Sequence, residues 1–136
     1  MNRPRPGQLG HTCIRVKDVK SAIDFYNGLL GMPVVETRED RMAALGSAEN
    51  YLEVFKLRDD QTIADVDPQQ LRLNHFCLWV EDMEGLQERA AAAGHPFTQP
   101  IGASKNWVKA SIKVGWVVDP DGNRVELLEW VGTAEG

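Results

Sequence analysis

The order of hydrophobic and polar residues predicts the same series of elements twice along the chain. Residues 9–16 alternate with a period of two, which predicts a strand with one buried face. Between residues 19 and 30 the apolar positions recur three and four apart, which predicts a helix with Asp18 as its N-cap and Gly31 just beyond its end. Strand-like segments follow at residues 33–38, 41–45 and 51–57.

The second half of the chain repeats this order. Residues 71–80 alternate like the opening strand, and Asp82 stands at the start of a predicted helix that Gly94 ends. The apolar face of this helix is expected to consist of Met83, Leu86, Ala90 and Ala93. Strands are predicted at residues 96–99, 110–118 and 124–130, with a loop at 101–107 and a turn at 119–123.

Two βαβββ units predict an α+β fold, with eight strands in open, barrel-like sheets and two helices on the outside. A pattern that returns in the same order means that one structural unit is used twice. At 136 residues the chain is expected to be a single domain. Its first module covers about residues 8–57, a polar and acidic linker covers 58–70, and the second module covers about 71–131.

Two short motifs mark the beginning and the end of each unit. The pattern His-x-Cys-(Ile/Leu)-x-Val-x-Asp begins at His11 and again at His75, and Asn-x-(Leu/Val)-Glu-(Val/Leu) contains Glu53 and again Glu126. Each helix must cover the wholly apolar face of its strands, so alternation leaves these four residues on the other face. Aromatic residues flank them there, namely Tyr51, Phe55, Trp79 and Trp130. Polar groups among aromatic side chains are typical of a binding pocket.

The paired histidines and glutamates predict a metal site. A lone histidine in a strand is more often hydrogen-bonded than a ligand, and a lone glutamate more often faces solvent, but here each recurs at the matching place of a repeat. Carboxylates among apolar neighbours are costly without a cation. Two imidazoles and two carboxylates suit one divalent ion, which is Ni²⁺, Zn²⁺, Co²⁺, Mn²⁺ or Fe²⁺. Cys13 and Cys77 are interpreted as small buried apolar residues, with thiolate ligands as the alternative.

Charge and composition exclude other classes of protein. The net charge of −5 argues against a nucleic-acid partner, which requires clustered positive charge. No apolar run approaches the roughly 18–20 residues of a membrane span. The basic start has no apolar segment behind it, so we expect no signal peptide, no membrane partner and a cytoplasmic location. The expected partner is a small-molecule substrate.

The assembled residues resemble the vicinal oxygen chelate superfamily, and within it most closely the bacterial glyoxalase I family. The resemblance covers about residues 9–130. It is carried by His11-Thr-x-x-Arg15-Val-x-Asp18, Ile23-Asp-Phe-Tyr26, Leu30-Gly-Met32, and Asp119-Pro-Asp-Gly122 before Val125-Glu126-Leu127. It implies two βαβββ modules around one metal ion. It also implies a homodimer, because a sheet with one open face needs a partner and relatives often take that partner from another subunit.

The resemblance further implies a metal-dependent lyase or isomerase. Such an enzyme moves a proton between adjacent carbons of a 2-oxoaldehyde–thiol adduct or a similar hydroxy-ketone, with Glu53 or Glu126 as the base. The residues expected to contact the substrate are Arg15, Phe55, Trp79 and Trp130. An iron-dependent dioxygenase and a protein that sequesters a small molecule are the alternatives. The family uses an asparagine to hold glutathione where this chain has Leu57, so the metal chemistry transfers further than the substrate does.

Overall fold

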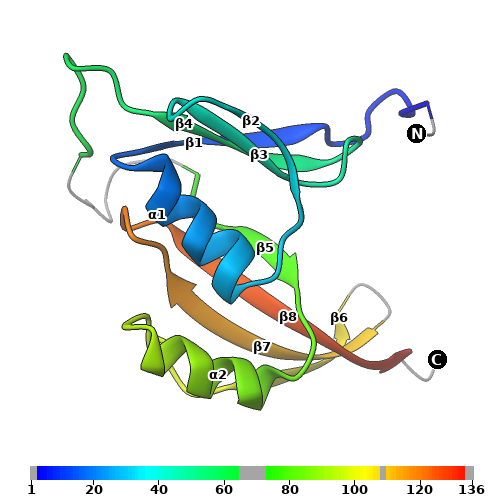
Figure 1. Ribbon diagram of the computed structural model, residues 1–136. Coiled ribbons are helices and arrows are strands. Elements are labelled where there is room, and N and C mark those ends of the chain that lie inside the picture. Colours follow the sequence, from blue (N-terminus) through cyan, green and yellow to red (C-terminus); the bar gives the residue numbers. More distant parts are fainter. Residues whose placement is uncertain (1–2, 65–72, 108–109, 134–136) are drawn as a thin grey trace. The chain divides into compact units, whose positions relative to one another are not determined.

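The computed structural model describes residues 3–64, 73–107 and 110–133 (Figure 1). The chain divides into two compact units, Met1–Val66 and Asp67–Gly136, and each contains one open four-stranded sheet and one helical segment. The predicted α+β fold is confirmed. Part of the predicted linker, and residues 71–72 of the predicted strand, lie outside the described ranges, so the module boundaries stay a prediction. In the described part of the chain, no helix is long and apolar enough to cross a membrane.

The first unit has the predicted βαβββ order. Its elements are β1 (His11–Val16), α1 (Val19–Ile23), η1 (Asp24–Leu29), β2 (Val34–Arg38), β3 (Met42–Gly46) and β4 (Tyr51–Lys56). The strands are ordered β1-β4-β3-β2 across the sheet, with β1 parallel to β4 and the other neighbours antiparallel. Contacts of α1 with β3 and β4 place the helix on the face that carries the buried Val16 and Val54.

The helix of the first unit differs in its second half from the regular helix that the sequence predicts. Asp18 is the N-cap as expected, since its carboxylate accepts a 3.1 Å hydrogen bond from the amide of Ser21. Beyond Ile23 the backbone widens into the π-helix η1, in which the amide of Leu30 reaches back five residues to the carbonyl of Phe25. The wider turn changes the buried face, so Phe25 is buried beside Tyr26 although a regular spacing leaves it out.

The second unit repeats the order of elements. They are β5 (Phe76–Trp79), α2 (Met83–Ala92), β6 (Gly102–Trp107), β7 (Ala110–Val118) and β8 (Arg124–Thr133). The strands are ordered β5-β8-β7-β6, and β5 is parallel to β8. Asp82 caps α2 by accepting from the amide of Gly85 at 3.2 Å. Between β7 and β8 the buried carboxylate of Asp119 accepts from the amides of Asp121 and Asn123, which closes the predicted turn.

Three expectations for the second unit are wrong. Residues 96–99 are not a strand, and residues 101–107, expected to be a loop, contain β6. Pro96 and Pro100 flank the first segment and lack the amide hydrogen that a strand ladder needs, and Thr98 donates to the carbonyl of Trp116. Ala93 is the exposed C-cap of α2, so it does not belong to the buried face of Met83, Leu86 and Ala90.

Candidate functional site

The two predicted histidine–glutamate pairs occupy matching positions in the two sheets. In the first unit Cys13 of β1 lies opposite Glu53 of β4, and in the second unit Cys77 of β5 lies opposite Glu126 of β8. Each histidine stands two residues before its cysteine. Because side chains two residues apart in a strand point to the same face, the histidine lies on the face of the sheet that carries the glutamate. The sequence repeat is therefore also a repeat of strand register.

The pair in the second unit is in direct contact. Nε2 of His75 lies 3.1 Å from Oε2 of Glu126, and the two side chains are partly buried, with 34% and 22% of their surface exposed. Nδ1 of His75 lies 2.7 Å from Oδ1 of Asn74, which also accepts a 3.1 Å hydrogen bond from Nη1 of Arg124. Because Arg124 can only donate, the Asn74 oxygen is an acceptor, and the imidazole proton belongs on Nδ1. Nε2 faces the Glu126 carboxylate, so a proton or a cation must lie between these two atoms.

Aromatic side chains hold this arrangement in place. The Trp116 ring meets the His75 ring edge-on, with the centroids 4.7 Å apart, and the Arg124 guanidinium lies 4.6 Å over the Trp116 ring. Asn74, Arg124 and Trp116 were not predicted from the sequence. The only sequence signal for Asn74 is its position directly before the motif histidine. Trp116 and Arg124 belong to β7 and β8, which are distant from His75 in the sequence.

The pair in the first unit is arranged differently. The ring of His11 stacks on Tyr51, its direct neighbour across the strands, with centroids 5.0 Å apart and planes 14° apart. Glu53 is partly buried one step further along the same face. Its charge, after burial itself, raises the pKa of the Cys13 thiol. His11 and Glu53 thus share a face, with the imidazole held by stacking.

The imidazole and carboxylate in each unit are ligand types that suit a divalent cation. An imidazole whose Nε2 faces a carboxylate, and whose other nitrogen is fixed by a hydrogen bond, resembles the arrangement that metal-binding histidines commonly have. Within the described ranges no group of three or more His, Cys, Asp or Glu side chains is close enough to hold one ion. The four-residue ligand set of His11, Glu53, His75 and Glu126 therefore stays a prediction.

The cysteines of the two motifs are unsuited to thiolate chemistry. Burial, and then the charge of Glu126, raises the pKa of Cys77 to about 11. Burial, and then the charge of Glu53, likewise raises the pKa of Cys13. Both thiols are protonated at neutral pH, and both cysteines are exposed, so they are not the buried apolar residues that the sequence predicts.

The predicted substrate contacts form one pair in each unit. The Arg15 guanidinium lies 5.0 Å over the Phe55 ring, and its Nη1 reaches the carbonyl of Lys56 at 3.5 Å. The rings of Trp79 and Trp130 lie 6.3 Å apart and are tilted by 59°. These two tryptophans are 62% and 53% exposed.

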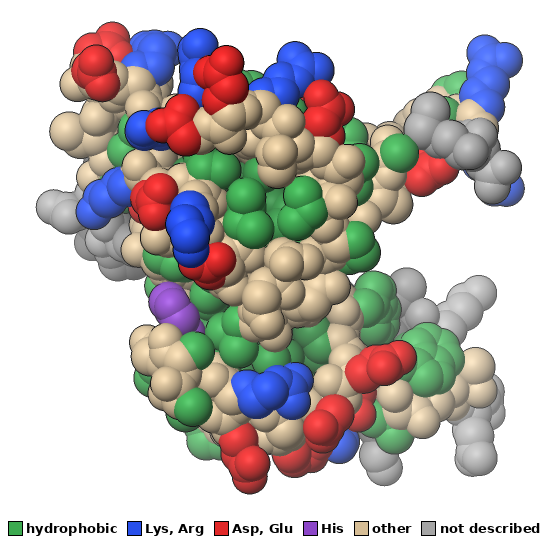
Figure 2. All heavy atoms as spheres, viewed as in Figure 1, with side chains coloured by type: hydrophobic (Ala, Val, Ile, Leu, Met, Phe, Trp, Pro, Cys, Tyr) green, Lys and Arg blue, Asp and Glu red, His purple; other side chains and the backbone are tan. Residues whose placement is uncertain are grey.

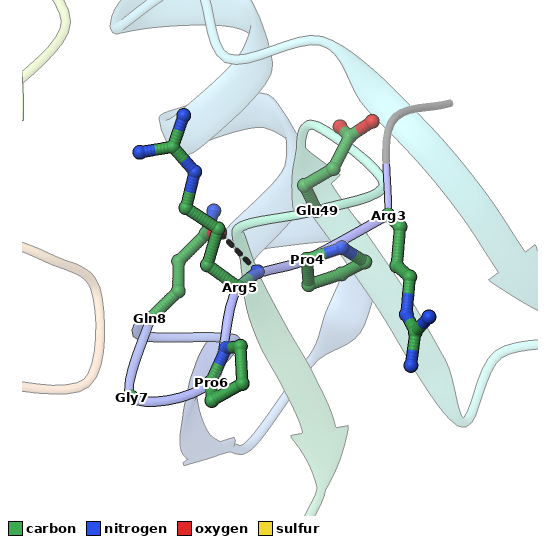
Figure 3. Close-up of a pocket in the computed structure, with 7 residues that line it drawn as sticks. All are labelled: Arg3, Pro4, Arg5, Pro6, Gly7, Gln8 and Glu49. Atoms are coloured by element: carbon green, nitrogen blue, oxygen red, sulfur yellow. Dashed lines mark hydrogen bonds between the residues drawn. The ribbon is translucent and has the colours of Figure 1, made fainter.

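A cavity of about 760 Å³ lies away from all of these residues, beneath the N-terminal segment (Figure 3). Arg3, Arg5 and Glu49 line it, together with prolines and Gln8. Figure 3 shows the two guanidinium groups pointing away from each other, and the hydrogen bond between Arg5 and Gln8 closes a local turn. Its polar groups do not converge on a common point, so we assign no ligand to this cavity.

Comparison with known proteins identifies the family. Residues 8–127 match the model of the glyoxalase/bleomycin resistance protein/dioxygenase superfamily. The chain belongs to this superfamily. A lactoylglutathione lyase of Salmonella typhimurium is 30% identical over 128 residues, covering 90% of this chain and 92% of that protein. A lactoylglutathione lyase of Haemophilus influenzae is 26% identical over 139 residues, covering 95% and 97%.

Solved structures of the superfamily share the fold. A putative glyoxalase from Bacillus halodurans has a TM-score of 0.72 at 19% identity, covering 91% of this chain and 96% of its own. A glyoxalase family protein from Enterococcus faecalis has a TM-score of 0.67 at 24% identity, covering 91% and 98%. The resemblance inferred from the repeated motifs is thereby confirmed at the level of the superfamily.

Proposed function

We propose that this superfamily member is a metal-dependent isomerase of the glyoxalase I type. It moves a proton between the adjacent carbons of a 2-oxoaldehyde–thiol adduct or a similar hydroxy-ketone. The observation that carries the proposal is the His75–Glu126 pair, with its imidazole held by Asn74, at a register position that His11 and Glu53 duplicate. The similarity to lactoylglutathione lyases over most of the chain supports the same reaction class.

In this proposal four residues hold the metal ion: His11, Glu53, His75 and Glu126. The bound ion supplies Lewis acidity at the two neighbouring oxygens of the substrate, which lowers the cost of removing the proton beside the carbonyl. Asn74 and Arg124 keep the His75 proton on Nδ1, so that Nε2 faces the carboxylate.

The base is a glutamate. Glu53 or Glu126 takes the proton from one carbon and returns it to the next, and the handedness of the substrate decides between them. Both side chains are partly buried, at the same place in their sheets, and apolar residues follow each of them along the strand.

An assay of the reaction, together with a metal analysis, tests the proposal. The protein purified without added metal should contain one divalent ion, and it should form thioester from methylglyoxal and glutathione well above the uncatalysed rate. A chelator should abolish this rate and the divalent ion should restore it. Replacing Glu53 by Gln should lower the rate by more than the loss of metal explains.

Three results would contradict the proposal in distinguishable ways. If the metal-bound protein forms thioester only at the uncatalysed rate, glutathione is excluded as the thiol. Leu57 offers no amide to hold glutathione, which agrees with such a result. Bound iron with oxygen consumption would indicate the dioxygenase branch of the superfamily. Full metal content in all four single variants of the ligand set would show that the site is elsewhere.

A further inference from the structure

One row of residues crosses the sheet of the first unit from edge to edge. Arg15 of β1 lies opposite Phe55 of β4, Phe55 lies opposite Met42 of β3, and Met42 lies opposite Arg38 of β2. Directly opposite residues in neighbouring strands point to the same face. The row therefore places a guanidinium at each end of a floor made by an aromatic ring and a thioether.

A cavity of about 570 Å³ lies over one end of this row. It is lined by Arg38, Glu39, Arg41, Met42 and Phe55, and its volume is in the range of small-molecule sites. Met42 and Phe55 are partly buried, whereas Arg38 and Arg41 are exposed. The lining thus combines an apolar floor with two cations at the rim.

The row lies next to a predicted catalytic residue. Glu53 stands two residues before Phe55 in β4, on the same face, which corresponds to about 6–7 Å along a strand. A small molecule with its reacting end at Glu53 would extend past the Arg15–Phe55 pair toward Arg38 and Arg41.

Ion pairs already present leave the arginines available. Nε of Arg38 lies 2.9 Å from Glu36, but the two side chains are 70% and 54% exposed, and such pairs contribute little. Asp40, beside Arg41 in the turn, is held by Nζ of Lys56 at 3.1 Å. Figure 2 shows side chains of both charges gathered along this upper edge of the first unit. Glu39 also lines the cavity, and its negative charge disfavours the binding of an anion there.

We propose that Arg38 and Arg41 form an anion subsite, which makes the substrate a molecule with an apolar or aromatic middle and a carboxylate or phosphate end. The proposal rests on the proposed function for the position of the reacting end at Glu53. The anion contact itself is independent of that chemistry, because guanidinium groups bind both kinds of oxyanion through paired N–H donors.

Calorimetric titration of the full-length protein with three matched probes tests the subsite. The probes are phenylacetate, benzyl phosphate and phenylacetamide, which share an aromatic ring and differ in the charged end. We expect at least one of the two anions to bind about tenfold tighter than the neutral amide. The preferred anion then distinguishes a carboxylate substrate from a phosphate substrate.

Variants separate the subsite from other sources of anion binding. The double variant Arg38→Gln/Arg41→Gln should bind the anions and the neutral amide with about equal affinity. The control Lys20→Gln/Arg58→Gln removes the same charge from exposed positions that do not line the cavity, and it should retain the preference. Glu39→Gln should strengthen anion binding, and Phe55→Leu should weaken all three probes alike.

Two outcomes would overturn the subsite. One is equal affinity of the wild-type protein for phenylacetamide and both anions. The other is an anion preference that survives in the double variant, as expected if the anion binds a metal ion instead. Because neither thiol nor 2-oxoaldehyde is present, a protein that shows the preference but no isomerase activity refutes the proposed reaction alone.

Discussion

At the scale of single residues, Asn74 fixes which ring nitrogen of His75 faces Glu126. Its Oδ1 cannot donate, and it is already bound to the Arg124 guanidinium, so it accepts the proton of Nδ1. His11, in contrast, follows a glycine and is held by the ring of Tyr51. The two histidines of the repeat are therefore positioned by different forces, hydrogen bonding in one unit and stacking in the other.

Replacing Asn74 by Ala should weaken metal binding without unfolding the protein. Loss of a hydrogen-bonding partner behind a ligand histidine commonly costs about tenfold to a hundredfold in affinity. Competition between the protein and a chelator for Co²⁺ or Ni²⁺ measures this directly. Asn50→Ala, at an exposed turn of the first unit, is the matched control. An unchanged affinity in Asn74→Ala would show that Asn74 does not orient a metal ligand.

At the scale of elements, Gly115 of β7 lies against the side chain of Met83 at the start of α2. A methyl group at this position would come within 2.8 Å of Sδ of Met83 and 2.7 Å of the Phe97 ring. Met83 is fully buried and its amide donates to Glu129 of β8, so the start of α2 is fixed on the sheet and yields little. Glu129 thereby holds the start of α2 on the sheet.

Gly115→Ala should therefore destabilise the protein by about 1–3 kcal/mol, the usual cost of overpacking a core. Urea unfolding, followed by circular dichroism, gives the change in free energy. Gly132→Ala in β8 is the control, because nothing lies within 4 Å of its added methyl group. A loss of stability as large in the control as in Gly115→Ala would mean that strand propensity, and not contact with Met83, causes the effect.

The elements that the sequence predicts are those whose cause is local. Alternation and caps located β1, β4, both helices and the turn at Asp119, because each depends on neighbouring residues. The π-helical turn that buries Phe25 was missed, since it depends on packing against the sheet. β6 is not predicted because its small and polar residues show no two-residue alternation, and only its pairing with β7 makes it a strand. The same reason separates Glu126, found through the repeat, from Arg124, which meets Asn74 only through strand pairing.

At the scale of the whole molecule, the second unit has an apolar face that includes its exposed tryptophans. Trp79 pairs with Leu128 and Trp130 pairs with Ile112 across the strands, and Val131 beside them is 60% exposed. Leu128 and Ile112 belong to a buried apolar cluster on this face. Exposed large apolar side chains such as Trp79 and Trp130, close together on one face, are typical of a protein interface. The open edge and face of a four-stranded sheet are where a second copy of this chain would bind.

We therefore predict a homodimer in which Trp130 is buried. Light scattering at micromolar concentration should give twice the chain mass of 15.2 kDa. Trp130→Glu should shift the protein to the monomer, because a charge buried at an interface without a partner costs several kcal/mol. Val35→Glu, at an exposed apolar position of the first unit, should remain dimeric. A monomeric wild-type protein would overturn the interface and leave the metal ligands unaffected, because the His75–Glu126 pair is complete within one chain.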